Sequence, residues 1–450
     1  MTNSEILRER NALFTLDPNR AYPVLDRAEG VYVWNVDGRR LLDAIAGIAV
    51  VNIGYGRDEV ITAMAEQAAR LPYAVPNIFA NEPAIRLADE IARFTPGDLD
   101  FVHFTSGGSE AVEVALKVAR QYHVLRGEPD RSVLISRWTS YHGATIGGLM
   151  VGGSKLRRRV YEPLLPETPH IRTPYCYRCP WPEAHPECGI PAADELEAAI
   201  IHAGPDRVAA FIAEPIVASV GGALRPPNEY WPRIREICDR YGVLLIVDEV
   251  VTGFGRTGRF FAVDHWDVVP DLLVMGKGLS GGYAPLGAVA VRAPIRATFV
   301  DAGAAFEHIF TFGGNPISSA AALAVLEIWE GDALTEHVAV MESDFRTALE
   351  RLREHRFIGD IRVSGFMASI EFVADRKTRE PFPPDAKVGA RVREAGLRNG
   401  IVTYPGSGMA DGVRGDIVSL YPPLTFTTGH IAELVKGLEA AFIEIDRELS

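Results

Sequence analysis

The sequence has few cysteines, few lysines and no long apolar run. Four cysteines are too few for a disulfide framework in a chain of 450 residues. No apolar stretch approaches the ~20 residues of a membrane span, and Met1–Asn11 lacks the apolar core of a signal peptide. These absences favour a soluble cytoplasmic protein with no membrane contact.

Positive charge is scarce relative to negative charge. The formal net charge of −13 argues against nucleic-acid binding, because nucleic-acid-binding modules carry basic patches. The one short basic run, Arg157–Arg159, is expected to be a solvated surface. Hydrophobic residues make up 47% of the chain, enough for a large core. The length predicts two or three domains of ~150 residues.

Short apolar runs alternate with helical patterns from about residue 57 onward. The runs are Phe101–Phe104, Val133–Ile135, Val208–Ala213, Val243–Val247 and Leu272–Met275. Continuous apolar strands separated by helices are typical of a parallel sheet covered on both faces, and such sheets bind ligands at the carboxyl ends of their strands. We therefore expect residues 57–315 to form a large α/β domain.

The two ends of the chain have a different pattern. The turn signal Asp37–Gly38 predicts a hairpin within residues 1–56. Residues 316–450 predict helices and short strands of a smaller α+β domain, which ends in an amphipathic helix from about Ile431 to Leu449. We expect residues 1–56 to be an N-terminal segment that belongs to this small domain.

Lys277 is the lysine with an unusual setting. The chain has six lysines against forty arginines, and the other five lysines lie in polar or helical stretches. Lys277 closely follows the run Leu272–Met275 and has a glycine on each side, which lets the backbone approach a ligand. A lysine at the carboxyl end of a strand suits a Schiff base, although a flexible surface loop would give the same pattern.

Two acidic residues also end apolar runs. Asp248 follows Val243–Val247, and Glu214 follows Val208–Ala213. A buried carboxylate without a partner is costly, and the cationic ring nitrogen of pyridoxal phosphate would be a suitable partner for Asp248. A capping or ion-pair role is the alternative for both acids.

Two loops carry further candidates. In Thr105–Glu110, the N–H groups at a helix start are suited to hold a phosphate, whereas an N-cap at Ser109 is the simpler interpretation. In Tyr141–Gly143, the aromatic ring is suited to stack on a planar ligand, and an ordinary half-buried tyrosine is the alternative.

Two further motifs would indicate a dinucleotide site and a zinc site, but both matches are weak. Gly253–Gly258 matches the dinucleotide pattern GxGxxG, but it does not follow a strand directly and no clear helical pattern comes after it. Cys176, Cys179, His185 and Cys188 lack the two-knuckle spacing of known zinc sites, so we expect reduced thiols and no metal.

Over nearly its whole length the sequence resembles class III pyridoxal-phosphate aminotransferases. The motifs that carry the resemblance occur in the family's order and are Phe104–Ala111, Tyr141–Gly143, Glu214–Pro215, Asp248–Val250, Thr252–Gly258, Lys277–Gly278 and Thr311–Pro316. The resemblance implies a fold-type I transferase with a large domain on a mostly parallel seven-stranded sheet and a smaller α+β domain. It also implies pyridoxal 5′-phosphate as cofactor and a homodimer with active sites at the subunit interface.

The resemblance also implies roles around the cofactor ring. Lys277 would form the Schiff base and shuttle the proton, and Asp248 would keep the ring nitrogen protonated. Tyr141 and Val250 would pack on opposite faces of the ring. Two further residues would lie near the cofactor, namely His142 and Glu214.

For the cofactor phosphate, the resemblance implies Gly108 and Ser109, joined by Thr311 from the partner subunit. The family commonly has Asn-Ser-Gly-Ser in this loop, whereas this chain has Ser106–Ser109 with a glycine at position 107. Backbone donors are unaffected by that departure, so we expect phosphate binding to persist with altered strength.

Ser219 and Val251 bear on the substrate. Glutamate-using members of the family commonly have a glutamate and a glutamine at these two positions. The departures resemble the omega-amino acid/amine:pyruvate branch, which moves an amino group from an amine or amino acid to a 2-oxo acid. Arg414 is the candidate for binding a substrate carboxylate. Ala49 stands where related amine transaminases often have a bulky aromatic residue, so it would widen the pocket for larger donors.

Other functions remain open at this level. A decarboxylase or aminomutase of the same fold would share these motifs, as would a glutamate/2-oxoglutarate aminotransferase. A non-enzymatic or NAD-binding α/β protein is a separate hypothesis. It predicts no visible chromophore and no effect of replacing Lys277.

Overall fold

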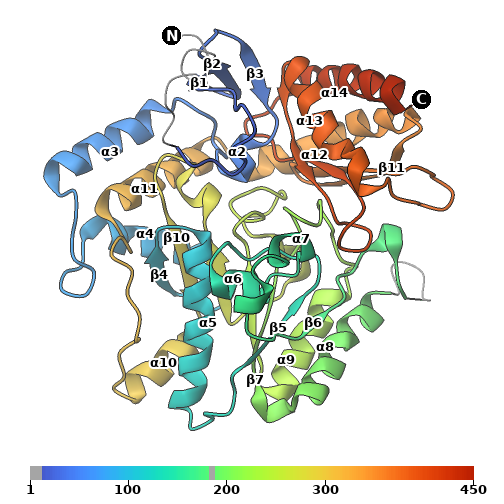
Figure 1. Cartoon of the computed structure of the whole chain (residues 1–450). Coiled ribbons are helices and arrows are strands. Elements are labelled where there is room, and N and C mark those ends of the chain that lie inside the picture. The colour runs from blue at the N-terminus through green and yellow to red at the C-terminus, as the bar shows by residue number, and fades with distance from the viewer. Residues whose placement is uncertain (1–12, 182–187, 450) are drawn as a thin grey trace.

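The computed structural model describes residues 13–181 and 188–449. Three sheets organise the described chain: one of seven strands and two of four. The N-terminal strands and the C-terminal part lie together above the large sheet (Figure 1). No helix in the described ranges combines the length and the apolar character that a bilayer crossing needs.

Six of the seven strands in the large sheet run in the same direction. In sheet order the strands are β4 (Phe101–Thr105), β10 (Gly287–Val291), β9 (Leu272–Met275), β8 (Leu244–Asp248), β7 (Val208–Ala213), β5 (Val133–Arg137) and β6 (His170–Ile171). The exception, β10, pairs antiparallel with both β4 and β9, and the other neighbours pair in parallel. The expected α/β fold with a mostly parallel seven-stranded sheet is confirmed.

Both faces of this sheet are buried. In β7, Phe211 packs into the core beneath α8 and α9, whereas Ala210 and Ile212 pack into the core beneath α5. This alternation follows from the pleat of a strand, and it explains why the strands are apolar throughout. The helices on the two faces and the adjoining edge are α5 (Gly108–Leu125), α6 (Ile146–Val151), α7 (Lys155–Arg158), α8 (Gly189–Ala203), α9 (Tyr230–Tyr241) and α10 (Ala293–Asp301).

Strands from the two ends of the chain share one sheet. It contains β1 (Leu25–Glu29), β2 (Tyr32–Asn35), β3 (Arg40–Asp43) and β13 (Ile401–Val402). The turn at Asp37–Gly38 joins β2 and β3 in the expected hairpin, and β13 pairs in parallel with β3. This pairing supports our proposal that residues 1–56 belong with residues 316–450 and that residues 57–315 form the large domain.

The remaining elements build the C-terminal part and bridge it to the large sheet. The second four-stranded sheet contains β11 (Ile358–Ser364), β12 (Met367–Phe372), β15 (Ile417–Leu420) and β14 (Tyr404–Gly406). Its helices are α12 (Leu334–Glu350), α13 (Val388–Arg398) and α14 (Thr428–Leu449). The bridging helices are α3 (Asp58–Arg70), α4 (Glu82–Ala92) and α11 (Pro316–Gly331), and Figure 1 shows α3 and α11 side by side.

A left-handed turn, α2 (Ala46–Ala49), follows β3. All four of its residues have positive φ values, including the β-branched Ile48 at 73°. Such conformations cost ~1–2 kcal/mol for each residue that has a side chain. The buried carboxylate of Asp43 holds the turn, because it accepts hydrogen bonds from the Ile45 and Gly47 N–H groups and from the Tyr55 hydroxyl.

Candidate active site

Lys277 lies two residues beyond the carboxyl end of β9. Its backbone is left-handed, with φ of 43°, and its side chain is half-buried. Burial lowers the pKa of its amine to about 8, although the carboxylates of Asp248 and Glu214 act in the opposite direction. Both acids are therefore within electrostatic reach of the lysine, and the three strand ends that carry them meet at one edge of the sheet.

The glycines on either side of Lys277 have a packing role. A Cβ atom at Gly276 would lie 3.2 Å from the Gly108 nitrogen, and one at Gly278 would lie 2.3 Å from the Asn52 Nδ2 atom. The lysine loop thus packs directly on the start of α5 and on the N-terminal segment. The sequence predicts that these glycines let the backbone approach a ligand; the contacts show that they let it approach neighbouring protein.

Asp248, the last residue of β8, is held at both carboxylate oxygens. Oδ1 accepts the Val250 N–H at 3.0 Å, and Oδ2 lies 2.8 Å from His142 Nδ1. Both side chains are almost completely buried. The other ring nitrogen of His142 is buried and has no hydrogen-bond partner within the described residues. The carboxylate is therefore oriented by the backbone and by one imidazole, with no arginine or lysine ion pair among these residues.

Glu214 directly follows β7 and is also buried. Its two oxygens accept the Tyr141 and Ala218 N–H groups, each at 3.3 Å. Burial raises its pKa to about 7, partly offset by His142 and Arg137 and reinforced by Asp248. Glu214 is therefore within electrostatic reach of both His142 and Asp248, and it positions the backbone of Tyr141.

The glycine-rich loop joins β4 to α5. The helix begins at Gly108, where a Cβ atom would lie 2.9 Å from both Val250 methyl groups. Ser109 is not the N-cap, because its Oγ accepts the Ala144 N–H at 3.1 Å and the cap position is Gly107. The loop and the start of α5 consequently lie against Val250, two residues beyond Asp248.

Three predicted site residues do not join this cluster within the single chain. Thr311 is exposed in the loop between α10 and α11, and its carbonyl accepts the Tyr73 hydroxyl at 3.1 Å. Arg414 pairs on the surface with Asp411 and Glu380, each at 2.7 Å. Ala49 is buried at the end of the left-handed turn. Their proposed roles stay predictions.

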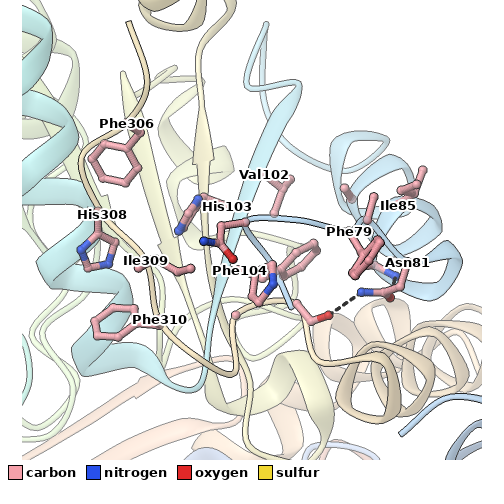
Figure 2. A pocket seen from close by; sticks show the side chains of 17 residues that line it. Phe79, Asn81, Ile85, Val102, His103, Phe104, Phe306, His308, Ile309 and Phe310 are labelled. Carbon is pink, nitrogen blue, oxygen red and sulfur yellow. Dashed lines mark hydrogen bonds between the residues drawn. The ribbon is translucent and has the colours of Figure 1, made fainter. Parts of the chain in front are cut away.

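The loop that carries Thr311 lines a cavity of about 540 Å³ through other residues, among them Ile309 and Phe310 (Figure 2). The side chains of Phe306, His308 and Phe310 lie on one side of it, and those of Phe79 and Ile85 lie on the other (Figure 2). His103 and Phe104 of β4 lie between these two groups. The cavity is thus built from the loop before α11, the strand before the glycine-rich loop and the start of α4.

The basic run Arg157–Arg159 is not simply solvated. Arg158 is buried and donates to the carbonyl oxygens of Leu149, Met150 and Gly152, so the expectation is wrong for this residue. Arg157 is exposed, but its guanidinium lies over the Tyr141 ring, 4.7 Å from the ring centroid. A basic run on its own gives no signal of such contacts.

Sequence reasoning also missed a pair of residues that anchors the lysine loop. Arg256 is completely buried and donates to Asn52 Oδ1 at 2.5 Å. Asn52 in turn donates to the Phe254 carbonyl at 3.3 Å and packs against Gly278. The arginine lies within Thr252–Gly258 and its partner within Asn52–Gly56, two segments that resemble the family, but nothing in the sequence indicated that these residues, 204 positions apart, are in contact.

The cysteine motif is only partly described. Cys176, Cys179 and Cys188 form no disulfide among the described residues, and His185 lies outside those residues. No set of three or more His, Cys, Asp or Glu residues that could hold a metal occurs in the two described ranges.

Comparisons with known proteins agree on one family. The model of the class-III aminotransferases matches residues 17–442. A putrescine–pyruvate aminotransferase from Pseudomonas aeruginosa is 38% identical over 92% of this chain and 88% of that protein. A probable aminotransferase from Mycobacterium tuberculosis is 43% identical over 84% of this chain and 82% of that protein.

Solved structures give the same result. A thermostable (S)-enantioselective omega-transaminase from Thermomicrobium roseum superimposes with a TM-score of 0.91 at 37% identity, over 98% of this chain and 97% of that one. An amine transaminase from an uncultivated Pseudomonas species, solved with pyridoxal phosphate bound, has a TM-score of 0.88 at 36% identity over 96% and 98%. This chain belongs to the class III aminotransferases, fold-type I transaminases whose cofactor is pyridoxal phosphate.

Proposed function

We propose that this aminotransferase moves an amino group from an amine or omega-amino acid to pyruvate, in two successive half-reactions on the same lysine. The observation that carries the proposal is Lys277, with its pKa lowered to about 8, at the sheet edge that also presents Asp248 and Glu214. The putrescine–pyruvate relative and the omega-transaminase structure support the substrate class. Ser219 and Val251 support it too, because neither matches the glutamate-using pattern.

The residues present fit pyridoxal phosphate. Gly108 and Ser109 open α5, where backbone N–H groups and the helix dipole favour a phosphate. Asp248 offers a carboxylate whose side-chain partner among the described residues is His142, and the other ring nitrogen of His142 is buried without a partner among these residues. When bound, the cofactor supplies an aldehyde carbon that takes up the amino group and a ring that withdraws electrons from the substrate.

Lys277 acts as the base and the acid at the reacting carbon. Because burial lowers its pKa to about 8, a useful fraction of the free amine is neutral near pH 7. The neutral amine would remove the proton from the donor carbon that carries the nitrogen and would return a proton on the other side of that nitrogen. In the second half-reaction the same nitrogen moves the proton in the opposite sense, which gives the amino acid product.

The neighbouring residues orient the reactants. The carboxylate of Asp248, held by Val250 N–H and His142, would keep a proton on the ring nitrogen. Tyr141 and Val250 would pack on the two faces of the ring. Glu214 holds the Tyr141 backbone through a 3.3 Å hydrogen bond. Together these residues would orient the ring beside Lys277.

We also propose that the enzyme works as a homodimer in which a second copy covers the cavity of Figure 2. The loop beside it exposes Ile309 and Phe312, and the segment opposite exposes Ile78 and Phe79. Such adjoining apolar side chains favour a protein interface. Thr311 lies in the same loop, so the interface would carry it to the phosphate of the partner subunit. Light scattering of the purified protein measures the oligomeric state.

The visible spectrum of the purified holoenzyme tests the activity. We expect added L-alanine, but not L-glutamate, to remove the absorbance band of the lysine-bound cofactor and to release pyruvate. A response to glutamate alone would keep the family and contradict the pyruvate assignment. Release of carbon dioxide, or movement of the amino group within one molecule, would instead indicate a decarboxylase or an aminomutase.

A further inference from the structure

Arg137, the last residue of β5, is a buried cation with 1% of its surface exposed. Its Nη2 atom donates to the main-chain carbonyl of Glu214 at 2.5 Å. It forms no ion pair with an acidic side chain of the described residues, and its Nε–H is buried without a hydrogen-bond partner among them. A buried charge is costly unless an opposite charge lies close to it.

Two aromatic rings at the start of α9 hold the guanidinium of Arg137. Its carbon lies 5.8 Å from the centroid of the Tyr230 ring and 5.7 Å from that of Trp231, and both side chains are completely buried. Trp231 Nε1 in turn donates to the carbonyl of Pro215 at 3.1 Å. The guanidinium and the indole thus fix two consecutive main-chain carbonyls beyond β7, those of Glu214 and Pro215.

The carboxyl of Glu214 is the opposite charge within reach of this cation. Burial raises the pKa of that carboxyl to about 7, whereas His142 and Arg137 lower it and Asp248 raises it further. Its remaining titratable neighbours are Lys277 and Tyr421. A guanidinium keeps its charge at every working pH, whereas an imidazole or an amine can lose a proton. Arg137 is therefore the fixed positive charge of this set.

We propose that Arg137 is a positioning residue of the reaction, which binds the Glu214 main chain and supplies the fixed charge that keeps a carboxylate within electrostatic reach of Lys277. The inference rests on the proposed roles of Glu214 and Lys277. An ionised Glu214 accepts the Tyr141 N–H more strongly than a neutral acid does, and it favours the charged form of the lysine amine. Without the guanidinium, Glu214 would ionise at a higher pH.

Arg137→Met tests the proposal, with Arg137→Lys as the matched variant. Both lose the planar fork that binds the Glu214 carbonyl, but only methionine also removes the charge. We expect Arg137→Met to raise the pH below which kcat/KM falls by roughly one unit, the lower end for a neighbouring opposite charge. Arg137→Lys should leave that pH unchanged. A purely structural role predicts equal losses of Tm and activity in both variants and no shift in either.

The same exchange in a Glu214→Gln background tests the route of the effect. Glutamine keeps an oxygen that can accept the Tyr141 N–H, but it does not ionise. If Arg137 acts through the carboxyl of Glu214, adding Arg137→Met to this background should cause no further shift of the pH profile. A shift that persists there would show that the arginine acts on another group and would overturn the assignment.

A second readout does not depend on turnover. In the infrared difference spectrum between the unmodified holoenzyme and Glu214→Gln, the carboxyl band reports the ionisation of Glu214 directly. We expect a midpoint near pH 7 in the unmodified protein and in Arg137→Lys, and one about a unit higher in Arg137→Met.

The infrared midpoint of the unmodified protein also serves if Arg137→Met does not fold. A midpoint of about 8 to 9, which is typical of a buried glutamate whose burial nothing offsets, would refute the proposal. So would an equal pH profile in Arg137→Met and Arg137→Lys. Failure of the proposed function is distinguishable, because the visible band of the unmodified protein would then not respond to L-alanine, and the infrared midpoint alone would decide the role of Arg137.

Discussion

The carboxyl edge of the large sheet and the loop around Arg414 arrange charged groups in opposite ways. At the sheet edge, Asp248 and Glu214 are buried, and backbone N–H groups hold them. In the loop, Arg414 pairs with Asp411 and Glu380, and 41% of its side chain is exposed. The loop charges neutralise one another in solvent. The buried carboxylates have no arginine or lysine partner among the described residues, so they can still pair with a ligand. A charge is available for chemistry where the protein orients it without cancelling it.

The largest effect should come from Lys277→Arg. This variant keeps a positive charge, but a guanidinium neither forms the bond to the cofactor nor exchanges protons near neutral pH. We expect the visible band to disappear and turnover to fall by roughly 10⁴-fold, the upper end for a lost acid–base group. Lys436→Arg on exposed α14 is the control and should behave as wild type. A normal band in Lys277→Arg would refute the assignment.

Asp248→Asn should have the next largest effect. The amide keeps the shape but removes the negative charge opposite His142, 2.8 Å away. Loss of one charged hydrogen bond predicts a decrease of about tenfold to a hundredfold in kcat/KM. Steady-state kinetics with saturating cofactor measure this decrease. Asp239 lies on the exposed side of α9, so the control variant Asp239→Asn should not change the rate. Equal losses in both variants would contradict a special role for the buried carboxylate of Asp248.

Glu249 extends the comparison from activity to stability. Burial raises its pKa to about 8, although the Thr252 hydroxyl and the Val263 N–H hydrogen-bond to it. Because the folded carboxyl binds its proton more tightly than the unfolded one, its stabilising contribution is present at low pH and is lost as pH rises through about 8. The loss amounts to ~1.4 kcal/mol for each pH unit between about 4.5, the ordinary pKa of the group, and about 8.

Glu249→Gln should therefore gain stability relative to wild type as pH rises from about 4.5 to about 8. The Tm difference between the two proteins at each pH measures this gain. Glu236→Gln is the control, because Glu236 is exposed and hydrogen bonds from Arg233 hold its pKa below the usual range. Its Tm difference should stay constant across the same window. A constant difference for Glu249→Gln as well would show that the carboxyl is ionised in the folded protein.

The smallest effect should come from Arg414→Gln. An exposed ion pair contributes only ~0.2–1 kcal/mol, so we expect a Tm close to that of wild type. Asp411→Ala should destabilise more, because Asp411 also accepts the N–H groups of Val413 and Arg414 and thereby closes the turn, and alanine has no acceptor there. Thermal unfolding of the two variants compares them. A larger loss in Arg414→Gln than in Asp411→Ala would mean that the arginine has a structural role.

Local pattern was sufficient for most of the architecture. The apolar runs of β7, β8 and β9 predicted buried parallel strands, and the Asp37–Gly38 turn predicted the hairpin. The antiparallel direction of β10 could not be predicted. The run Gly287–Val291 is as apolar as its parallel neighbours, and strand direction leaves no local signal in the sequence. The left-handed turn at Ala46–Ala49 has no signal either, because Asp43 and Tyr55 impose it from outside.

Sequence reasoning could predict those site residues that directly follow an apolar strand. Lys277, Asp248 and Glu214 follow apolar runs, and the structure brings them to one edge. The position of Arg157 over the Tyr141 ring depends instead on Tyr404, 247 residues away in the chain. A contact of that kind arises only when the C-terminal part packs on α7, so spacing could not predict it.

The position of β4 at the edge of the large sheet affects the order in which the protein can assemble. β4 leads into the glycine-rich loop, and its pairing is with β10, where Thr105 lies opposite Gly287. During synthesis, β5, β7 and β8 can associate as they emerge, but β4 must wait for a strand made almost two hundred residues after it. We therefore expect a nascent chain to acquire the lysine before it has a finished phosphate-binding end, and the cofactor to be captured late in biosynthesis.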